Sequence, residues 1–206
     1  MPSPSAPRRG RPPSVDQDRI LTATYELLRE KGVARLSTRE IAERAGVAEG
    51  SIFYRYKDRA GLLIAVYADA LRPMAEYERN PPDLNDIRAT LANFTELLEN
   101  YLERALTVLY SAQADTELRA ALHEHIRVND IGPHHGLKII GGYLADLQAQ
   151  GHIRPDIDPA AAASLLLDNC HTRVALPRLF GRGRGVVSRD AILDTFLTSM
   201  APTGNN

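Results

Sequence analysis

Hydrophobic residues recur at intervals of three and four positions along most of this chain, and no segment alternates strictly between hydrophobic and polar residues. That period is typical of amphipathic α-helices, whereas a half-buried strand would alternate. The sequence therefore predicts an all-α protein. The pattern predicts helices at about residues 15–31, 38–45, 48–56, 59–74 with a bend near Pro73, 84–102 (continued by or followed by 103–112), 116–131, 137–150, 159–179 with an interruption near Pro177, and 189–200.

Residues with short polar side chains stand just before most of these segments. There they can accept hydrogen bonds from the free backbone N–H groups at the start of a helix. Ser14 with Gln17, and Ser37 with Glu40, have the spacing of a capping box. Glycine ends helices because it adopts the left-handed conformation without strain. We expect N-caps at Ser14, Ser37, Asp58, Asp115, Asp158 and Ser188, and glycine ends at Gly32, Gly46 and Gly151.

Residues 36–59 predict two very short helices joined by a tight turn. Gly46 ends the first helix and Val47 fills the turn, while Ile52 and Tyr56 lie four apart on the inner face of the second helix. A helix of about two turns is not stable alone, so neighbouring helices must hold both at a fixed angle. This is the geometry of a helix-turn-helix, whose second helix enters the major groove of DNA.

The outer side of this unit is rich in hydrogen-bond donors, with little acid between them. Such a face suits phosphate oxygens and base edges. The alternative is a three-helix unit that packs without touching DNA, but packing alone would not require these donors. We predict DNA contacts from Ser37, Thr38, Arg39, Glu49, Gly50, Ser51, Tyr54, Arg55, Lys57 and Arg59.

Residues 20–63 resemble the DNA-binding domain of the TetR family of bacterial transcriptional repressors. The resemblance implies a homodimer in which this domain lies under a larger helical domain that binds a small-molecule effector. It implies that the last two long helices of each subunit form a four-helix interface, and that Arg39 reads a guanine. The matching residues are Ile20, Leu21, Ala23, residues 27 to 32, Ser37, Ile41, Ala42, Ala45, Gly46, Val47, Gly50, Ser51, Ile52, Tyr56 and Arg59.

Three residues depart from the family pattern. Ala48 stands where the family usually has a capping serine, so a contribution of ~1 kcal/mol to the second helix is lost. Glu49 replaces a residue that is often basic; it favours the helix dipole but repels nearby phosphates. Phe53 replaces the usual tyrosine, whose phosphate contact must then come from Tyr54 or Arg55.

Charge is distributed unevenly along the chain, although the net charge is only -1. Residues 1–60 hold 12 Lys or Arg against 8 Asp or Glu, whereas residues 61–206 hold 13 against 18. A polyanionic partner should therefore meet the amino-terminal part. Residues 1–13 form a Pro-rich basic arm. The segment with Arg9 and Arg11 resembles the core of an AT-hook, a short basic motif that binds in the minor groove of DNA. The alternative is an ordinary solvated tail.

The single cysteine, Cys170, excludes an intrachain disulfide, and no apolar run of about 18 or more residues is present to cross a membrane. The amino terminus lacks the apolar region of a secretory signal. We therefore expect a cytoplasmic protein without a membrane partner. Along the chain we expect the arm at 1–13, the DNA-binding domain with its connecting helix at 14–79, and a helical ligand-binding and dimerisation domain at 80–206, with Asn80-Pro81-Pro82 as the linker.

Histidine and acidic residues give no convincing catalytic or metal site. His123 and His125 are about 200° apart around a helix and cannot converge on one ion. His134 and His135 flank a helix break, and Cys170 with His171 has no third partner. Because no nucleophile elbow, catalytic carboxylate pair or phosphate-binding loop is found either, we assign no metal, no cofactor and no enzymatic activity.

Several polar residues of the second domain lie on or near apolar helix faces, where a polar group needs a partner. They either bond to one another, to water or across a subunit contact, or they line a pocket for a small ligand. We predict a ligand pocket formed by Phe94, Tyr110, His125, Asn129, Asn169 and Arg173.

The reading that accounts for these features is a homodimeric, ligand-responsive repressor that binds a palindromic DNA operator. We expect dimerisation through residues 159–179 and 188–200, with Leu193 and Phe196 on the apolar face. The alternative is a small-molecule-binding protein or enzyme that keeps a vestigial DNA-binding unit.

Overall fold

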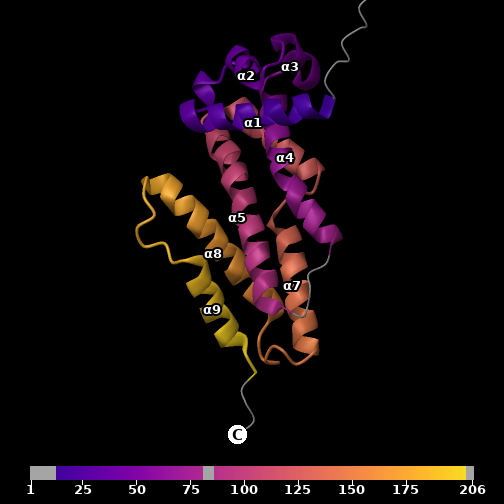
Figure 1. The fold of residues 1–206 in the computed structure, drawn as a ribbon, viewed down its shortest axis with the longest axis vertical. Coiled ribbons are helices and arrows are strands. Elements are labelled where there is room, and N and C mark those ends of the chain that lie inside the picture. Colours follow the sequence, from indigo (N-terminus) through magenta and orange to yellow (C-terminus); the bar gives the residue numbers. More distant parts are fainter. Residues whose placement is uncertain (1–12, 81–85, 203–206) are drawn as a thin grey trace, which may run out of the picture.

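The computed structural model describes residues 13–80 and 86–202, and all its regular elements are helical, as the hydrophobic period predicts (Figure 1). The predicted arm with Arg9 and Arg11, and Pro81-Pro82 of the predicted linker, lie outside these residues. None of the described helices is both long and apolar enough to span a bilayer. The helices are α1 (Pro13–Lys31), α2 (Thr38–Ala45), α3 (Glu49–Tyr56), α4 (Arg59–Arg79), α5 (Ile87–Ala112), α6 (Thr116–Val128), α7 (Pro133–Ala149), α8 (Pro159–Phe180) and α9 (Arg189–Met200), with a 3-10 turn at Val33–Arg35.

Helix α1 and the two short helices α2 and α3 lie at one end of the molecule, across the ends of the long helices (Figure 1). Helix α5 runs down the middle and packs against α4, α8 and α9, while α7 packs against α8. The outer sides of α8 and α9 are not covered by any other described element in this view (Figure 1). This arrangement confirms a helix-turn-helix unit followed by a larger helical domain.

Four of the six predicted caps form in the structure. The carboxylates of Asp58, Asp115 and Asp158 and the hydroxyl of Ser188 each accept from a backbone N–H of the first helical turn. Two predictions were wrong. The Ser37 side chain makes no capping bond, and the Glu40 carboxylate of the predicted box pairs with Lys31 at 2.6 Å. Ser14 lies inside α1, which already begins at Pro13.

The long helices are more continuous than the sequence predicts. Helix α4 passes through Pro73 to Arg79, and α8 passes through Pro177. A proline inside a helix costs ~3 kcal/mol, but burial of Ala70 and packing of Tyr77 against Phe94 of α5 offset part of this cost. Residues 87–112 form one continuous helix, which is one of the two possibilities that the sequence left open. Helix α7 begins four residues earlier than expected because Pro133 suits its first turn.

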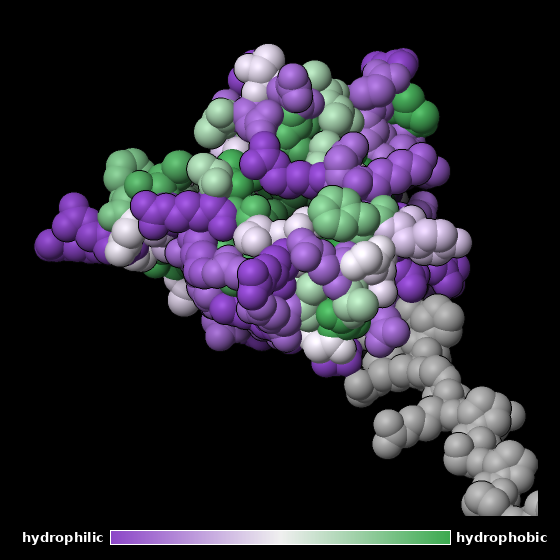
Figure 2. Space-filling view, turned by 90° about the horizontal axis from the view of Figure 1, so that it is seen from above, coloured by the Kyte–Doolittle hydropathy of each residue, from purple (hydrophilic) through white to green (hydrophobic). Residues whose placement is uncertain are grey.

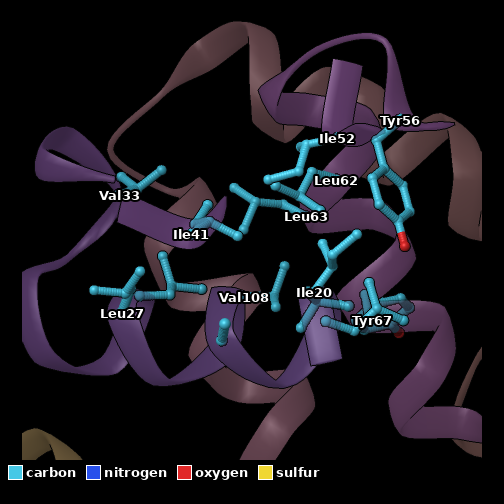
Figure 3. Packing of buried hydrophobic residues seen from close by; sticks show 14 of the residues in the cluster. Ile20, Leu27, Val33, Ile41, Ile52, Tyr56, Leu62, Leu63, Tyr67 and Val108 are labelled. Atoms are coloured by element: carbon cyan, nitrogen blue, oxygen red, sulfur yellow. The ribbon is translucent and has the colours of Figure 1, made fainter. Parts of the chain in front are cut away.

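The buried hydrophobic residues form two main clusters, and their division differs from the predicted boundary near residue 80. The first cluster joins α1 to α4 with the carboxyl-terminal half of α5 and with α6. Figure 3 shows Val108 of α5 directed towards Ile20 and Leu63 of the helix-turn-helix unit. The second cluster joins the amino-terminal half of α5 with α7, α8 and α9. Helix α5 therefore belongs to both cores.

Candidate DNA-binding surface

The turn between α2 and α3 has the local geometry that the sequence predicts. Gly46 is left-handed, with φ 63°, and ends α2, and the Val47 N–H donates to the carbonyl of Ala42 at 3.0 Å. Ile52 and Tyr56 are buried, and Val47 is half-buried in the turn. Figure 3 shows Ile52 and Ile41 pointing into the same core. These contacts hold α3 at a fixed angle to α2.

The opposite side of α3 is open to solvent. The side chains of Tyr54 and Phe53 are 93% and 51% exposed, and Glu49, Ser51 and Arg55 are exposed beside them. Seen from this end, hydrophilic side chains cover much of the molecule, with smaller hydrophobic areas between them (Figure 2). Large aromatic side chains exposed on a helix with no protein partner are unusual in a monomer and indicate a binding surface.

The acidic groups of this surface are occupied by neighbouring donors. The Thr38 hydroxyl donates to Glu49 Oε1 at 2.7 Å, which ties the first residue of α2 to the first residue of α3. Arg39 Nε donates to Glu43 at 3.1 Å, but both side chains are largely exposed. Such a pair is worth ~0.5 kcal/mol or less, so the guanidinium of Arg39 is readily released to another partner.

The corner between α3 and α4 is unusually tight. Lys57 has φ 66° and ψ -58°, and the Asp58 N–H donates to the Tyr56 carbonyl at 2.8 Å, which together form a γ-turn that is strained for a residue with a side chain. A Cβ atom on Gly61 would lie 2.2 Å from the same Tyr56 carbonyl oxygen. Gly61 was not among the predicted site residues, because its only signal in the sequence is a glycine in the first turn of a helix.

Arg59, a predicted DNA contact, instead reaches the second domain. Its guanidinium forms an ion pair with Asp115, the N-cap of α6, and donates to the Val33 carbonyl at 3.4 Å. The two Asp115 oxygens have different partners, because Oδ1 accepts from the Leu118 N–H at 3.0 Å and Oδ2 pairs with Arg59. The DNA contact of Arg59 stays a prediction, and its structural contact is with α6.

An ion pair joins α2 to α1, and the buried Tyr56 ring packs α3 against the same core. Arg44 of α2 forms a two-pronged pair with Glu30 of α1, and this hydrogen bonding lowers the pKa of the Glu30 carboxyl. Burial raises the pKa of Tyr56. The Tyr56 hydroxyl is shielded from solvent and has no hydrogen-bond partner among the described residues. The ring of Tyr56, and not its hydroxyl, therefore contributes to the packing of the unit.

The structure does not bring the six predicted ligand residues together. Phe94 is buried beside Tyr77, whereas Tyr110 is partly exposed sixteen residues further along the same straight helix, about 24 Å away at the usual rise per residue. One small ligand cannot contact both, and the prediction of a shared pocket was wrong in this respect. His125 and Asn129 lie at the end of α6, where the Asn129 amide donates to the His125 carbonyl at 2.8 Å.

The remaining two residues, Asn169 and Arg173, line a cavity of about 10 Å³ between α5, α8 and α9, which is about the size of one water molecule. The Asn169 amide also donates to its own helix, to the carbonyl of Leu165. Arg173 donates to the buried Glu99 at 2.7 Å, as does Arg189 at 2.6 Å. Here polar residues bond to one another, which is the alternative that the sequence left open. Burial raises the pKa of the adjacent Cys170 thiol to about 12.

The apolar residues of α9 chosen for the dimer interface serve the subunit's own core. Leu193 is fully buried in the second cluster, so its predicted place in the dimer interface was wrong, whereas Phe196 is only half-buried there and its place in the interface stays a prediction. The helical spacing of apolar residues indicates a buried face, but it does not indicate whether that face packs within the subunit or against a second subunit. Exposed apolar side chains instead lie on the other side of α8 and in the following loop: Leu165, Leu179, Phe180 and Val187.

Known proteins share both the sequence of the helix-turn-helix unit and the whole fold. Residues 20–66 match the profile of the bacterial regulatory proteins, tetR family. The chain is 24% identical over 153 residues to the fatty acid metabolism regulator protein of Bacillus subtilis (strain 168), a match that covers 71% of this chain and 75% of the relative.

Two solved structures extend the likeness over most of the chain. A TetR transcription regulator from Haloarcula marismortui superimposes with a TM-score of 0.69 at 19% identity, covering 92% of this chain and 100% of that one. SmeT in complex with triclosan superimposes with a TM-score of 0.64 at 23% identity, covering 92% and 93%. These likenesses show that the fold is shared.

Proposed function

Because this chain belongs to the tetR family of bacterial regulatory proteins, we propose that it represses transcription by binding a palindromic DNA operator as a homodimer and is released by a small molecule. The observation that carries this proposal is the outward face of α3. Its inner residues Ile52 and Tyr56 are buried, while Tyr54 is 93% exposed next to Ser51 and Arg55. A short, rigidly held helix with donors and aromatic groups on its free face suits the major groove.

Base readout and backbone contacts divide between the two helices. Arg39 on α2 is the candidate for a bidentate contact to guanine, which is worth ~1–3 kcal/mol of discrimination. Glu49 on α3 is acceptor-only, and it suits the amino group of cytosine while disfavouring a nearby phosphate. Lys57 and Arg55 supply charge to the phosphates. Because the proposed operator is part of the bacterial chromosome, the protein should act in the cytoplasm.

Dimerisation through α8 and α9 is supported by the exposed apolar side chains of α8. Leu165 and Leu179 are 62% and 61% exposed, fourteen positions apart, and lie on the same side of α8 by helical geometry. Isolated apolar residues need no explanation, but a line of them along an uncovered helix favours an isologous interface. A two-fold axis between the subunits then requires a palindromic operator.

The small-molecule effector belongs in the second hydrophobic cluster, between α5, α7, α8 and α9. SmeT is a relative in fold that binds triclosan. The cavity beside Asn169 and Arg173 is too small for such a ligand as it stands, so binding would require α9 to move away from α5. We expect a largely apolar compound with at least one polar group.

Selection of genomic DNA fragments by the full-length protein, followed by gel shift, tests the proposal. We expect one short palindrome bound at nanomolar protein. Tyr54→Ala should weaken this complex, whereas the matched change Tyr110→Ala, at a partly exposed tyrosine of α5 that is not a predicted DNA contact, should leave it unchanged. If no sequence is enriched over random fragments, the protein is better explained as a small-molecule-binding protein or enzyme with a vestigial DNA-binding unit.

A further inference from the structure

We propose that the corner between α6 and α7 binds one divalent transition-metal ion through Asp130, His134 and His135. Each of these side chains offers one ligand atom, and the three ligand atoms all lie within 4.8 Å of one another. All three residues are exposed, so an ion can enter from solvent. The sequence indicated two adjacent histidines without a third ligand. In the folded corner the Asp130 carboxylate lies close to both of them.

Backbone geometry at the corner orients the acidic ligand. Asp130 follows the end of α6 and is left-handed, with φ 51°, a conformation that is uncommon for a residue other than glycine. The chain then passes through Gly132 and starts α7 at Pro133. As a result, the Asp130 carboxylate lies 3.4 Å from Nε2 of His134, four residues later.

The second histidine is already held in the manner of a metal ligand. His135 Nε2 lies 2.7 Å from the Asp130 carbonyl oxygen and donates to it when protonated. A metal-binding histidine usually donates one ring N–H to a carbonyl or carboxylate, and this fixes the neutral tautomer and leaves the other nitrogen, here Nδ1, as a ligand. The two imidazole rings lie 4.3 Å apart between centroids, so small rotations of exposed side chains suffice to converge on one ion.

The ligand set determines the class of ion. Two imidazoles and one carboxylate suit Zn²⁺, Co²⁺ or Ni²⁺, whereas Mg²⁺ and Ca²⁺ prefer oxygen ligands throughout. Metal–ligand distances of about 2.1 Å require ligand atoms about 3.4 Å apart in a tetrahedral site. Three protein ligands leave at least one position for water. The Asp130 charge also offsets the partial positive charge at the start of α7.

An ion at this corner would join the end of α6 to the start of α7. The opposite end of α6 carries Asp115, which pairs with Arg59 beside the helix-turn-helix unit. Metal binding should therefore alter operator affinity. This consequence rests on the proposed function, whereas ion binding itself does not.

Titration of the full-length, metal-free protein with Co²⁺ tests the site, with d–d absorption and metal analysis as readouts. We expect one ion per chain, displaced by Zn²⁺. His134→Ala, His135→Ala and Asp130→Asn should each lower the affinity by about tenfold or more, since they remove a direct ligand. His152→Ala and His171→Ala, which remove exposed histidines elsewhere, should bind Co²⁺ as the wild type does.

Absence of saturable Co²⁺ binding would overturn the proposal, and so would unchanged affinity in all three corner variants. Thermal unfolding of each metal-free variant checks that it is folded, and the exposure of the three residues leads us to expect wild-type melting temperatures. Operator binding with and without Zn²⁺ is measured separately. If the protein binds Co²⁺ but no DNA palindrome, the metal site stands and the proposed repressor function fails.

Discussion

Replacement of Gly61 by alanine should disturb the corner that sets the angle of α3. The new Cβ would lie 2.2 Å from the Tyr56 carbonyl oxygen, and real Cβ atoms essentially never come within 3.0 Å of another atom. The backbone must therefore separate by roughly 1 Å, because the obstacle is a carbonyl and not a flexible side chain. That carbonyl already accepts from Asp58 at 2.8 Å within the strained turn at Lys57.

The expected change in the free energy of unfolding for Gly61→Ala is the sum of two opposing effects. Alanine in a helix is favoured over glycine by ~1 kcal/mol, whereas overpacking against an unyielding group costs ~1–3 kcal/mol. We expect Gly61→Ala to lower the free energy of unfolding by up to ~2 kcal/mol. Tyr56 is the last residue of α3, so relief of the clash also shifts the helix, and loss of one base contact would cost ~1–3 kcal/mol of binding.

Gly142→Ala is the matched control for this change. Gly142 is exposed in the middle of α7, and a Cβ there would meet nothing within 4 Å. This variant should gain ~0.5–1 kcal/mol and bind operator as the wild type does. Urea unfolding at one fixed protein concentration and gel shift measure both quantities. If Gly61→Ala is stabilised as much as Gly142→Ala, the close approach to Tyr56 does not constrain the corner.

Four further predictions address the remaining parts of the proposed function. Arg39→Ala should relax the preference at one base pair per half-site by ~1–3 kcal/mol, and an unchanged selected consensus would reduce Arg39 to a phosphate contact. Removal of residues 2–12 should weaken DNA binding and make its dependence on salt shallower; an equal slope would make the arm inert. Leu165→Asp should produce folded monomers in sedimentation, whereas Leu193→Asp should unfold the subunit because its side chain is fully buried. Asp115→Asn should keep the α6 cap through Oδ1 but lose the pair with Arg59, lowering stability by about 1 kcal/mol or less and changing the response of operator affinity to effector.

Local signals in the sequence predicted the helix-turn-helix unit well, because its geometry depends on neighbouring residues. Gly46 ends α2 and Asp58 caps α4 through bonds within three or four positions. The buried positions Ile52 and Tyr56 follow from the helical period alone. The same locality explains an error: the Ser37–Glu40 spacing favours a capping box, but Glu40 finds Lys31 of another helix instead.

Contacts between residues far apart in the chain could not be predicted in this way. The Arg59–Asp115 pair spans 56 positions, and no period or cap indicates it. The corner formed by Asp130 depends on a left-handed residue that is neither glycine nor asparagine. The apolar stripe of α9 predicted burial correctly, but hydrophobic periodicity cannot distinguish burial within a subunit from burial in a dimer.

Transmission of a signal from the second cluster to DNA must pass through the shared core, and not through the ion pair alone. A hundredfold release from operator would require ~2.7 kcal/mol of coupling between the two sites. Arg59 and Asp115 are 45% and 22% exposed, and such a pair contributes about 1 kcal/mol or less. Burial of one methylene group contributes ~0.8 kcal/mol, so changed packing of two or three such groups supplies the difference. Val108 of α5 and Leu118 and Leu122 of α6 are buried in the same cluster as the inner faces of α2 and α3, and a small shift of α5 would change their packing first.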